Sequence, residues 1–178
     1  MKGIVFTEFM EMVETKFDED MLEEVIEEAG VNDVYTAIGT YPHSDMVQLV
    51  VALSAKSGIE VAQLLEAFGG YLLNSFTQLY PHFFEKVHNS FDFLQQVEGF
   101  IHVEVKKIYP EAELPQFVTK RLSSTQLEMI YKSDRRMGAL AVGLIRGCLN
   151  FFGDDGEVRI INSTGDDTVV TFLIEVKE

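Results

Sequence analysis

The stretch "TQLEMIYKSDRRMGALAVGLIRGCLNFF", residues 125–152, decides the fold because it joins two kinds of element through a cluster of polar side chains. Its first part, to residue 133, has the pattern of a β-strand. Its last part, from residue 136, is apolar almost all round, which predicts a buried helix. Between them stand Tyr131, Ser133 and Arg135, a phenol, a hydroxyl and a guanidinium at every second position.

These three side chains would share one face of an extended backbone, because alternate residues of a strand point the same way. An arginine offers a planar fork to a carboxylate, and two hydroxyls can serve its remaining lone pairs. The triplet therefore suits an oxygen-rich anion. A solvated strand end is the alternative that this triplet alone leaves open.

Upstream of this stretch the apolar residues recur every three or four positions, which predicts helices. The third helix is expected to begin at the cap Ser44. Gly69 and Gly70 lie inside the fourth helix, where each costs about 1 kcal/mol relative to alanine, so something bulky should approach the backbone there. The expected helices are 3–17, 18–30, 44–58, 60–76 and a long fifth one over 89–109.

The remaining segments predict strands. Residues 114–120 have a strand pattern, and 157–176 has the pattern of a hairpin whose turn, "STGDD", lacks the acid spacing of a calcium loop. We therefore expect one α+β domain over residues 1–178, with a mainly helical N-terminal part followed by an antiparallel sheet with a buried helix.

Composition excludes several classes of partner. With 29 acidic against 14 basic residues, the formal net charge is −15, so nucleic acid and membranes are not expected as partners. No stretch reaches the roughly 18 apolar residues of a membrane helix, and the acidic N-terminus is untypical of a signal peptide, which makes a cytoplasmic protein the expectation. The single Cys148 lies in an apolar run and is expected to be a buried thiol.

No motif predicts an enzyme. The sequence has no Ser-His-Asp, Cys-His or HExxH spacing and no glycine-rich phosphate loop. Among the four histidines, His102 differs because Ile101, Val103 and Val105 surround it and should desolvate its imidazole. A hydrogen-bonded core histidine is the ordinary alternative for such a position.

One cofactor would use His102, the three-donor cluster and the 14 phenylalanines together. A flat apolar macrocycle with a central metal and two carboxylate tails needs an imidazole for its metal, hydrophobic side chains for its ring and donors for its tails. Haem b (iron protoporphyrin IX) is such a macrocycle, so these features make it a candidate cofactor, with a core histidine and a solvated strand end left open as the alternative.

The segments "MKGIVF" (1–6), "IHVEVKKIYPEAELPQF" (101–117) and "YKSDRR" (131–136) together resemble the H-NOX family, the haem nitric oxide/oxygen-binding domains related to the sensor part of soluble guanylate cyclase. The resemblance covers essentially the whole chain. It implies that His102 is the proximal iron ligand, that Tyr131, Ser133 and Arg135 clamp the propionates, and that Pro115 presses on the porphyrin. It also implies a pocket lined by Val5, Phe9, Leu72, Leu73, Phe76, Leu140 and Leu144.

The same resemblance implies that haem is held between a distal helical part, 1–60, and a cradling part with the sheet, 61–178. Family members that hold oxygen carry a distal tyrosine where this sequence has Leu140. A donor there would stabilise bound oxygen by about 1–3 kcal/mol, or roughly ten- to hundredfold, so its lack predicts binding of nitric oxide and CO without stable oxygen binding.

The resemblance also implies that signalling begins when nitric oxide weakens the bond between iron and His102 and the helical part shifts against the sheet part. The resemblance to bacterial domains of this length implies control of a separate histidine kinase, or of a cyclic-di-GMP enzyme such as a diguanylate cyclase or phosphodiesterase. Two alternatives stay open at this point: a reversible oxygen-binding haem protein and a haem-free protein-interaction module.

Overall fold

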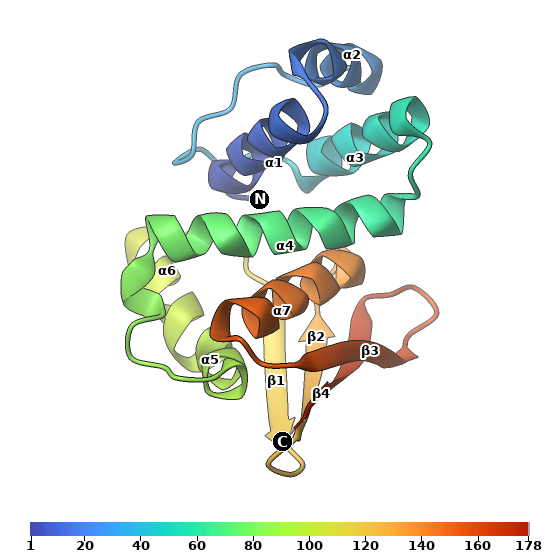
Figure 1. Ribbon diagram of the computed structural model, residues 1–178. Helices are drawn as coiled ribbons and strands as arrows, with labels where there is room; N and C mark the ends of the chain where they lie inside the picture. The colour runs from blue at the N-terminus through green and yellow to red at the C-terminus, as the bar shows by residue number, and fades with distance from the viewer. Residues whose placement is uncertain (178) are drawn as a thin grey trace.

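The computed structural model describes residues 1–177, and in it the helices come first and a four-stranded sheet follows, with one helix inserted between its second and third strands (Figure 1). The helical elements are α1 (Gly3–Lys16), α2 (Glu19–Ala29), α3 (His43–Ser57), α4 (Val61–Leu79), the 3-10 turn η1 (Pro81–Phe83), α5 (Ser90–Gln96), the π-helical turn η2 (Val97–Ile101), α6 (His102–Ile108) and α7 (Gly138–Phe152). The strands are β1 (Gln116–Arg121), β2 (Gln126–Lys132), β3 (Gly156–Ser163) and β4 (Val169–Val176). The expected α+β class is confirmed.

Local signals account for several helix ends. Asp18 accepts a hydrogen bond from the Met21 amide at 2.8 Å and starts α2, and Gly30 ends it with φ +62°. The prediction that α3 begins at Ser44 was wrong, because the helix begins at His43, directly after Pro42. The Ser44 hydroxyl donates to its neighbour Asp45 instead of capping the helix.

The expected long fifth helix is interrupted. Between α5 and α6 the chain widens into η2, where the His102 amide donates to the Val97 carbonyl five residues earlier. Gly99 weakens the helical preference of this turn by about 1 kcal/mol relative to alanine, and Glu98 in the same turn accepts a hydrogen bond from the Phe117 amide at 3.0 Å. That contact is between residues 19 positions apart, so periodicity along the helix could not reveal it.

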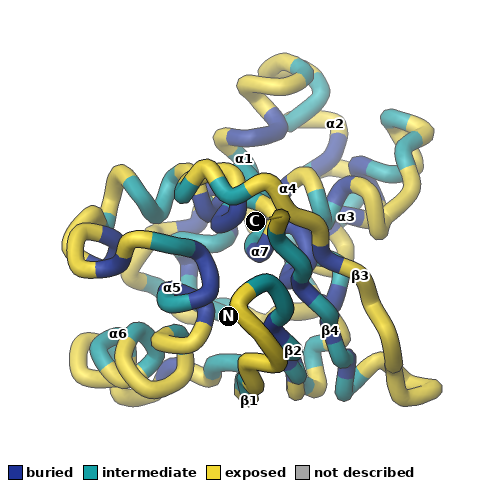
Figure 2. Tube along the Cα trace, turned by 60° about the horizontal axis from the view of Figure 1, so that its bottom comes forward, coloured by how far each residue is buried: buried dark blue, intermediate teal, exposed yellow. Residues whose placement is uncertain are grey.

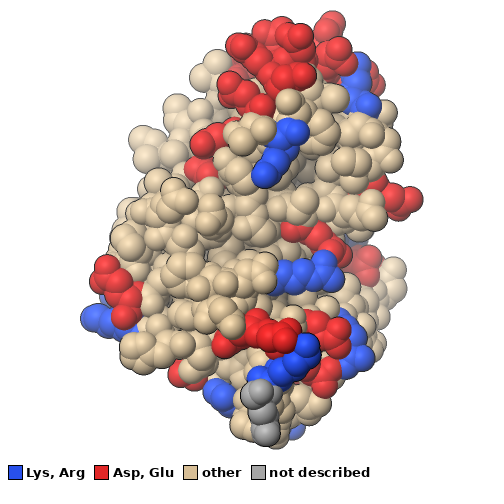
Figure 3. Space-filling model, viewed as in Figure 1, with Lys and Arg blue, Asp and Glu red and all other residues tan. Residues whose placement is uncertain are grey.

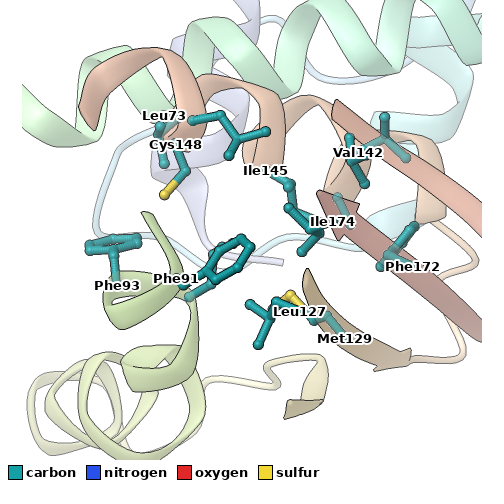
Figure 4. Packing of buried hydrophobic residues seen from close by; sticks show 14 of the residues in the cluster. Leu73, Phe91, Phe93, Leu127, Met129, Val142, Ile145, Cys148, Phe172 and Ile174 are labelled. Carbon is teal, nitrogen blue, oxygen red and sulfur yellow. The ribbon is translucent and has the colours of Figure 1, made fainter. Parts of the chain in front are cut away.

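All neighbouring strands of the sheet are antiparallel, in the order β1-β2-β4-β3. The side chains that alternate along β2 and β4 point to one face, where α7 and α5 cover them (Figure 4). Cys148 of α7 lies in this layer and is fully buried, as the sequence predicted, and burial raises the pKa of its thiol. The sheet residues of this core are Leu127, Met129, Tyr131, Val170, Phe172 and Ile174.

A second hydrophobic cluster lies between α1, α3 and α4, and its largest buried side chains include Phe6, Phe9, Met46 and Phe68. In Figure 1, α4 runs between the helices of the N-terminal part and the layer formed by α7 and the sheet. Accordingly α4 contributes side chains to both clusters. The division of the chain at residue 60 stays a prediction.

The surface is predominantly acidic at the end formed by α2, where acidic side chains gather (Figure 3). Within residues 1–177 no group of three or more histidine, cysteine, aspartate or glutamate side chains is placed to hold a metal ion. No single helix of that range is long and apolar enough to cross a membrane. Only α3 and α4 taken together reach the required length and composition, and they are bent by 114°.

Candidate functional site

His102 is the first residue of α6, and its side chain is only 14% exposed although η2 and α6 contain no buried residue and lie at the surface (Figure 2). Its Nδ1 lies 3.2 Å from Glu98 Oε2. Burial lowers the pKa of His102 below its ordinary value, while the Glu98 charge acts in the opposite direction. Within residues 1–177 its Nε2 has no hydrogen-bond partner, so a neutral imidazole with a free Nε2 is available to a metal.

A row of rings leads from His102 into the sheet. The Phe117 ring of β1 lies 5.8 Å from the His102 ring, and the Tyr131 ring of β2 lies 5.7 Å from that of Phe117, measured between centroids. Phe117 and Tyr131 are paired across the two strands. The sheet register therefore sets the position of Tyr131 relative to the histidine.

The expectation that Tyr131, Ser133 and Arg135 follow one another on an extended strand was wrong beyond the first of them. β2 ends at Lys132, and the chain then turns, with Arg136 in the left-handed region at φ 57°. The Arg135 amide donates to Ser133 Oγ at 3.2 Å within this turn. The alternation of the three residues therefore does not place their side chains on one strand face. Instead, a short polar turn holds the Ser133 hydroxyl against the Arg135 backbone.

The donors of this cluster are only partly used. The Tyr131 hydroxyl accepts the Met137 amide at 3.2 Å, and Ser133 Oγ accepts the Arg135 amide, so within residues 1–177 both hydroxyl protons lack an acceptor. Arg135 Nη2 donates to the Glu113 carbonyl at 2.7 Å, which leaves most guanidinium hydrogens free. Ser133 and Arg135 also line an open cavity of about 620 Å³. The cluster can donate several hydrogen bonds to a carboxylate.

The apolar residues proposed for the pocket are divided between the two hydrophobic clusters. Val5, Phe9, Leu72 and Leu140 belong to the N-terminal cluster. Leu73 belongs to the sheet cluster. Phe76 and Leu144 contact both.

These residues differ in burial. Phe9 is fully buried, whereas Val5, Phe76, Leu140 and Leu144 keep some exposed area. Pro115 is half-buried and lies one residue before β1, on the segment that joins α6 to the sheet. The residues of the predicted site thus lie on α1, α4, α6 and α7, on β2, in the turn after β2 and just before β1.

Two acidic residues of the site were missed by sequence reasoning. The sequence analysis did not single out Glu98, although its spacing of four from His102 is a signal that could have identified it. Glu113 contacts Arg135 through its carbonyl and, at 3.7 Å, through its carboxylate. No local pattern connects these two residues, because they are 22 positions apart and meet only in the fold.

Comparison with known proteins gives a consistent picture. The model of the haem-NO-binding family matches residues 2–160. The chain is 37% identical to the ferrous unliganded H-NOX protein from K. algicida, with a TM-score of 0.93, covering 100% of this chain and 97% of that one. None of the curated proteins matched.

Two further relatives were solved with gases bound. The H-NOX protein from S. oneidensis in the Fe(II)NO state is 25% identical, with a TM-score of 0.92 and full coverage of both chains. The H-NOX from Shewanella woodyi, bound to IWP-051 in the Fe(II)CO state, is 35% identical with a TM-score of 0.84, covering 98% of this chain and 94% of that one.

The cofactor of this family is haem b, and the donor set of this chain fits it. A neutral imidazole with a free Nε2 suits iron, and hydroxyl and guanidinium donors with unused hydrogens suit two propionates. The apolar side chains of the two clusters suit the ring. The chain belongs to the haem-NO-binding (H-NOX) family, whose members are haem-based gas-binding domains and not enzymes.

Proposed function

We propose that this chain is a gas sensor that binds nitric oxide, and also CO, at ferrous haem and does not bind oxygen stably. The observation that carries the proposal is Leu140, which lies in the N-terminal cluster beside the glycine contact of α4 and α7 and offers no hydrogen-bond donor. Leu72 and Phe9 in the same cluster are also apolar and buried.

Three polar residues lie near Leu72 along α4, and none supplies the missing donor. The hydroxyl of Tyr71, which precedes Leu72, is directed at Thr15 and Glu11 of α1. Asn74 is exposed, and the Ser75 hydroxyl donates to the Tyr71 carbonyl of its own helix at 3.3 Å. A distal hydrogen bond stabilises bound oxygen by about 1–3 kcal/mol, or ten- to hundredfold. Nitric oxide and CO need this donor less, so an apolar pocket favours them over oxygen.

We assign the roles of the site residues on the same basis. Haem, when bound, would supply a ferrous iron that can bind a diatomic gas. His102 Nε2 would hold the iron, and Tyr131, Ser133 and Arg135 would hold the propionates. Pro115 would contact the ring. The distal and peripheral lining would come from Val5, Phe9, Leu72, Leu73, Phe76, Leu140 and Leu144.

The contacts of α6 support a route from His102 to the N-terminal part. Just after α6, the Tyr109 ring lies 4.1 Å from Lys2 Nζ, and Glu111 Oε1 lies 3.5 Å from the same nitrogen. Lys2 Nζ also donates to the Ile38 carbonyl at 2.7 Å. Lys2 therefore joins the segment after α6 to the loop that precedes α3. A movement of α6 after release of His102 would change these contacts and so reach the N-terminal helices.

The partner is proposed from the resemblance alone: a separate histidine kinase, or a diguanylate cyclase or phosphodiesterase. The solved relatives support gas binding, since one carries NO and another CO, and they say nothing of an effector. The cytoplasmic location expected from the sequence stays a prediction.

An absorption spectrum of the reduced protein tests the function. We expect a ferrous haem spectrum that changes with nitric oxide and with CO and stays that of the gas-free protein in oxygenated buffer until the iron oxidises. A stable oxygen spectrum in air would favour a reversible oxygen binder. A colourless protein that stays colourless after haemin is added would favour a haem-free interaction module.

A further inference from the structure

We propose that Glu98 is a positioning residue for His102, which fixes the imidazole tautomer and strengthens its bond to the haem iron. This inference rests on the proposed role of His102 as the iron ligand. Glu98 Oε2 lies 3.2 Å from His102 Nδ1. Since a carboxylate only accepts hydrogen bonds, Nδ1 carries the proton and donates it to Glu98. The lone pair of the imidazole is then on Nε2.

The position of Glu98 is itself fixed by the fold. The same Oε2 accepts the Phe117 amide of β1 at 3.0 Å. In the wide turn η2, the His102 amide bonds to Val97, so His102 starts α6 directly after the turn that carries Glu98. One carboxylate oxygen therefore joins the histidine, the π-helical turn and strand β1 of the sheet.

A carboxylate that accepts the outer N–H of a metal-bound imidazole raises the basicity of the inner nitrogen, and loss of such a partner typically costs 10- to 100-fold in metal affinity. The Glu98 side chain is 47% exposed, so solvent weakens its effect and the lower end of that range applies. The positive charge of Lys106, on the next turn of α6, lowers the pKa of the His102 imidazole, whereas the Glu98 charge raises it. The balance of these groups would set how readily His102 leaves the iron once nitric oxide has bound.

Alanine and glutamine at position 98 separate the hydrogen bond from the charge. Glu98→Gln keeps a carbonyl oxygen for His102 and Phe117 but removes the charge, whereas Glu98→Ala removes both. Glu104→Gln is the matched control, because Glu104 is an acid of α6 two residues from His102 that pairs with Lys107 instead. All variants are compared as full chains loaded with haem.

The decisive measurement is the iron–histidine stretching frequency of the ferrous, gas-free protein by resonance Raman spectroscopy. We expect it to fall from wild type to Glu98→Gln and further to Glu98→Ala, with Glu104→Gln unchanged. We also expect the rate at which His102 leaves the iron after nitric oxide addition to rise about 10-fold in Glu98→Ala. A mere packing role would lower the melting temperature of the haem-free chain without moving the stretching frequency.

Two outcomes overturn the inference and can be told apart. If the wild type shows the iron–histidine band and both Glu98 variants show it at the same frequency, Glu98 does not act on the ligand while His102 keeps its proposed role. If the wild type shows no such band, His102 is not the ligand, and the inference falls together with that assignment.

Discussion

Gly69 of α4 and Gly143 of α7 bring two helix backbones into direct contact. A Cβ on Gly69 would lie 2.8 Å from the Gly143 Cα, and a Cβ on Gly143 would lie 2.9 Å from the Gly69 Cα. The bulky object that the sequence predicted near Gly69 is therefore the neighbouring helix. The Leu140 carbonyl lies at the same contact, so the contact fixes the part of α7 that carries the proposed distal residue.

Gly143→Ala should destabilise the fold, because the new methyl group would overlap the Glu66 carbonyl as well as Gly69. Overpacking of this kind typically costs about 1–3 kcal/mol of unfolding free energy. Gly70→Ala is the control. Its Cβ would meet only the Gly143 carbonyl at 3.9 Å, and alanine favours a helix over glycine by about 1 kcal/mol. Urea unfolding of both variants checks this, and equal stability would contradict the close contact.

His102→Gly should lose haem, or hold it only when imidazole is added to replace the missing side chain. The reason is that Nε2 of this buried imidazole is the group proposed to hold the iron. Haem content and the ferrous absorption spectrum are measured with and without imidazole. His82→Gly is a control, since His82 is exposed in η1. An unchanged ferrous spectrum in His102→Gly would remove His102 as the ligand.

The order of elements could be predicted from the sequence because each has its own period and its own caps. The α+β order, the buried α7 and the hairpin of β3 and β4 follow from such local signals. Contacts between distant residues could not be predicted in this way. Two examples are the hydrogen bond from the Phe117 amide to Glu98 and that from Arg135 to the Glu113 carbonyl. The partners are 19 and 22 positions apart, so no helical or strand periodicity relates them. The wide turn η2 was missed for the same reason.

The donor triplet shows that spacing along the chain did not predict its geometry. The alternation of Tyr131, Ser133 and Arg135 suggested a strand face, but only Tyr131 lies in β2. The other two lie in the turn that follows β2. In this turn the Ser133 amide donates to the carbonyl of Thr168, the residue just before β4. Residue type suggested the chemistry, which stays a prediction, whereas the turn after β2 sets where Ser133 and Arg135 lie.

Arg135→Ala should raise the rate of haem loss, because the guanidinium is the only permanently charged donor of the triplet. Its side chain is only 15% exposed, so its attraction for a carboxylate is less screened than that of a surface residue. Transfer of haem to an excess of apomyoglobin measures the loss rate. Arg136→Ala removes the same charge from the exposed neighbour and should change the rate little. Equal retention in the two variants would count against the clamp.

Tyr35 is expected to make the fold sensitive to alkali. Its ring stacks on Phe6 at 4.4 Å, its hydroxyl is buried without a hydrogen-bond partner within residues 1–177, and burial raises its pKa to about 12. The unfolded chain loses this proton near pH 10 and the folded chain only near pH 12. The contribution of Tyr35 to the unfolding free energy should therefore be constant below pH 10 and should fall between pH 10 and 12.

Tyr35→Phe keeps the stacked ring and removes the unpaired hydroxyl, so its stability at pH 7 should equal or exceed that of the wild type. The fall in its unfolding free energy above pH 10 should be smaller than in the wild type. It should not be absent, because burial also raises the pKa of Tyr71 and Tyr80. Urea unfolding at pH 7, 10 and 11 measures both effects. A pH dependence identical to the wild type would show that Tyr35 is not the group responsible.

Leu140→Tyr should strengthen oxygen binding, because a phenol at this position would place a hydrogen-bond donor in the proposed distal pocket. A donor of that kind is worth about 1–3 kcal/mol, which corresponds to a ten- to hundredfold gain in oxygen affinity. Leu140→Phe is the matched control, since it adds the ring without the hydroxyl and separates polarity from size. Absorption spectra of the reduced proteins are recorded under increasing oxygen and under nitric oxide.

Only the tyrosine variant should gain oxygen affinity, while nitric oxide binding should change little in either variant. A gain in both variants would show that pocket shape, and not the lack of a donor, limits oxygen binding in the wild type. A lack of gain in both would mean that the Leu140 side chain does not face the gas. In either case the selectivity for nitric oxide would need a cause other than the polarity of α7.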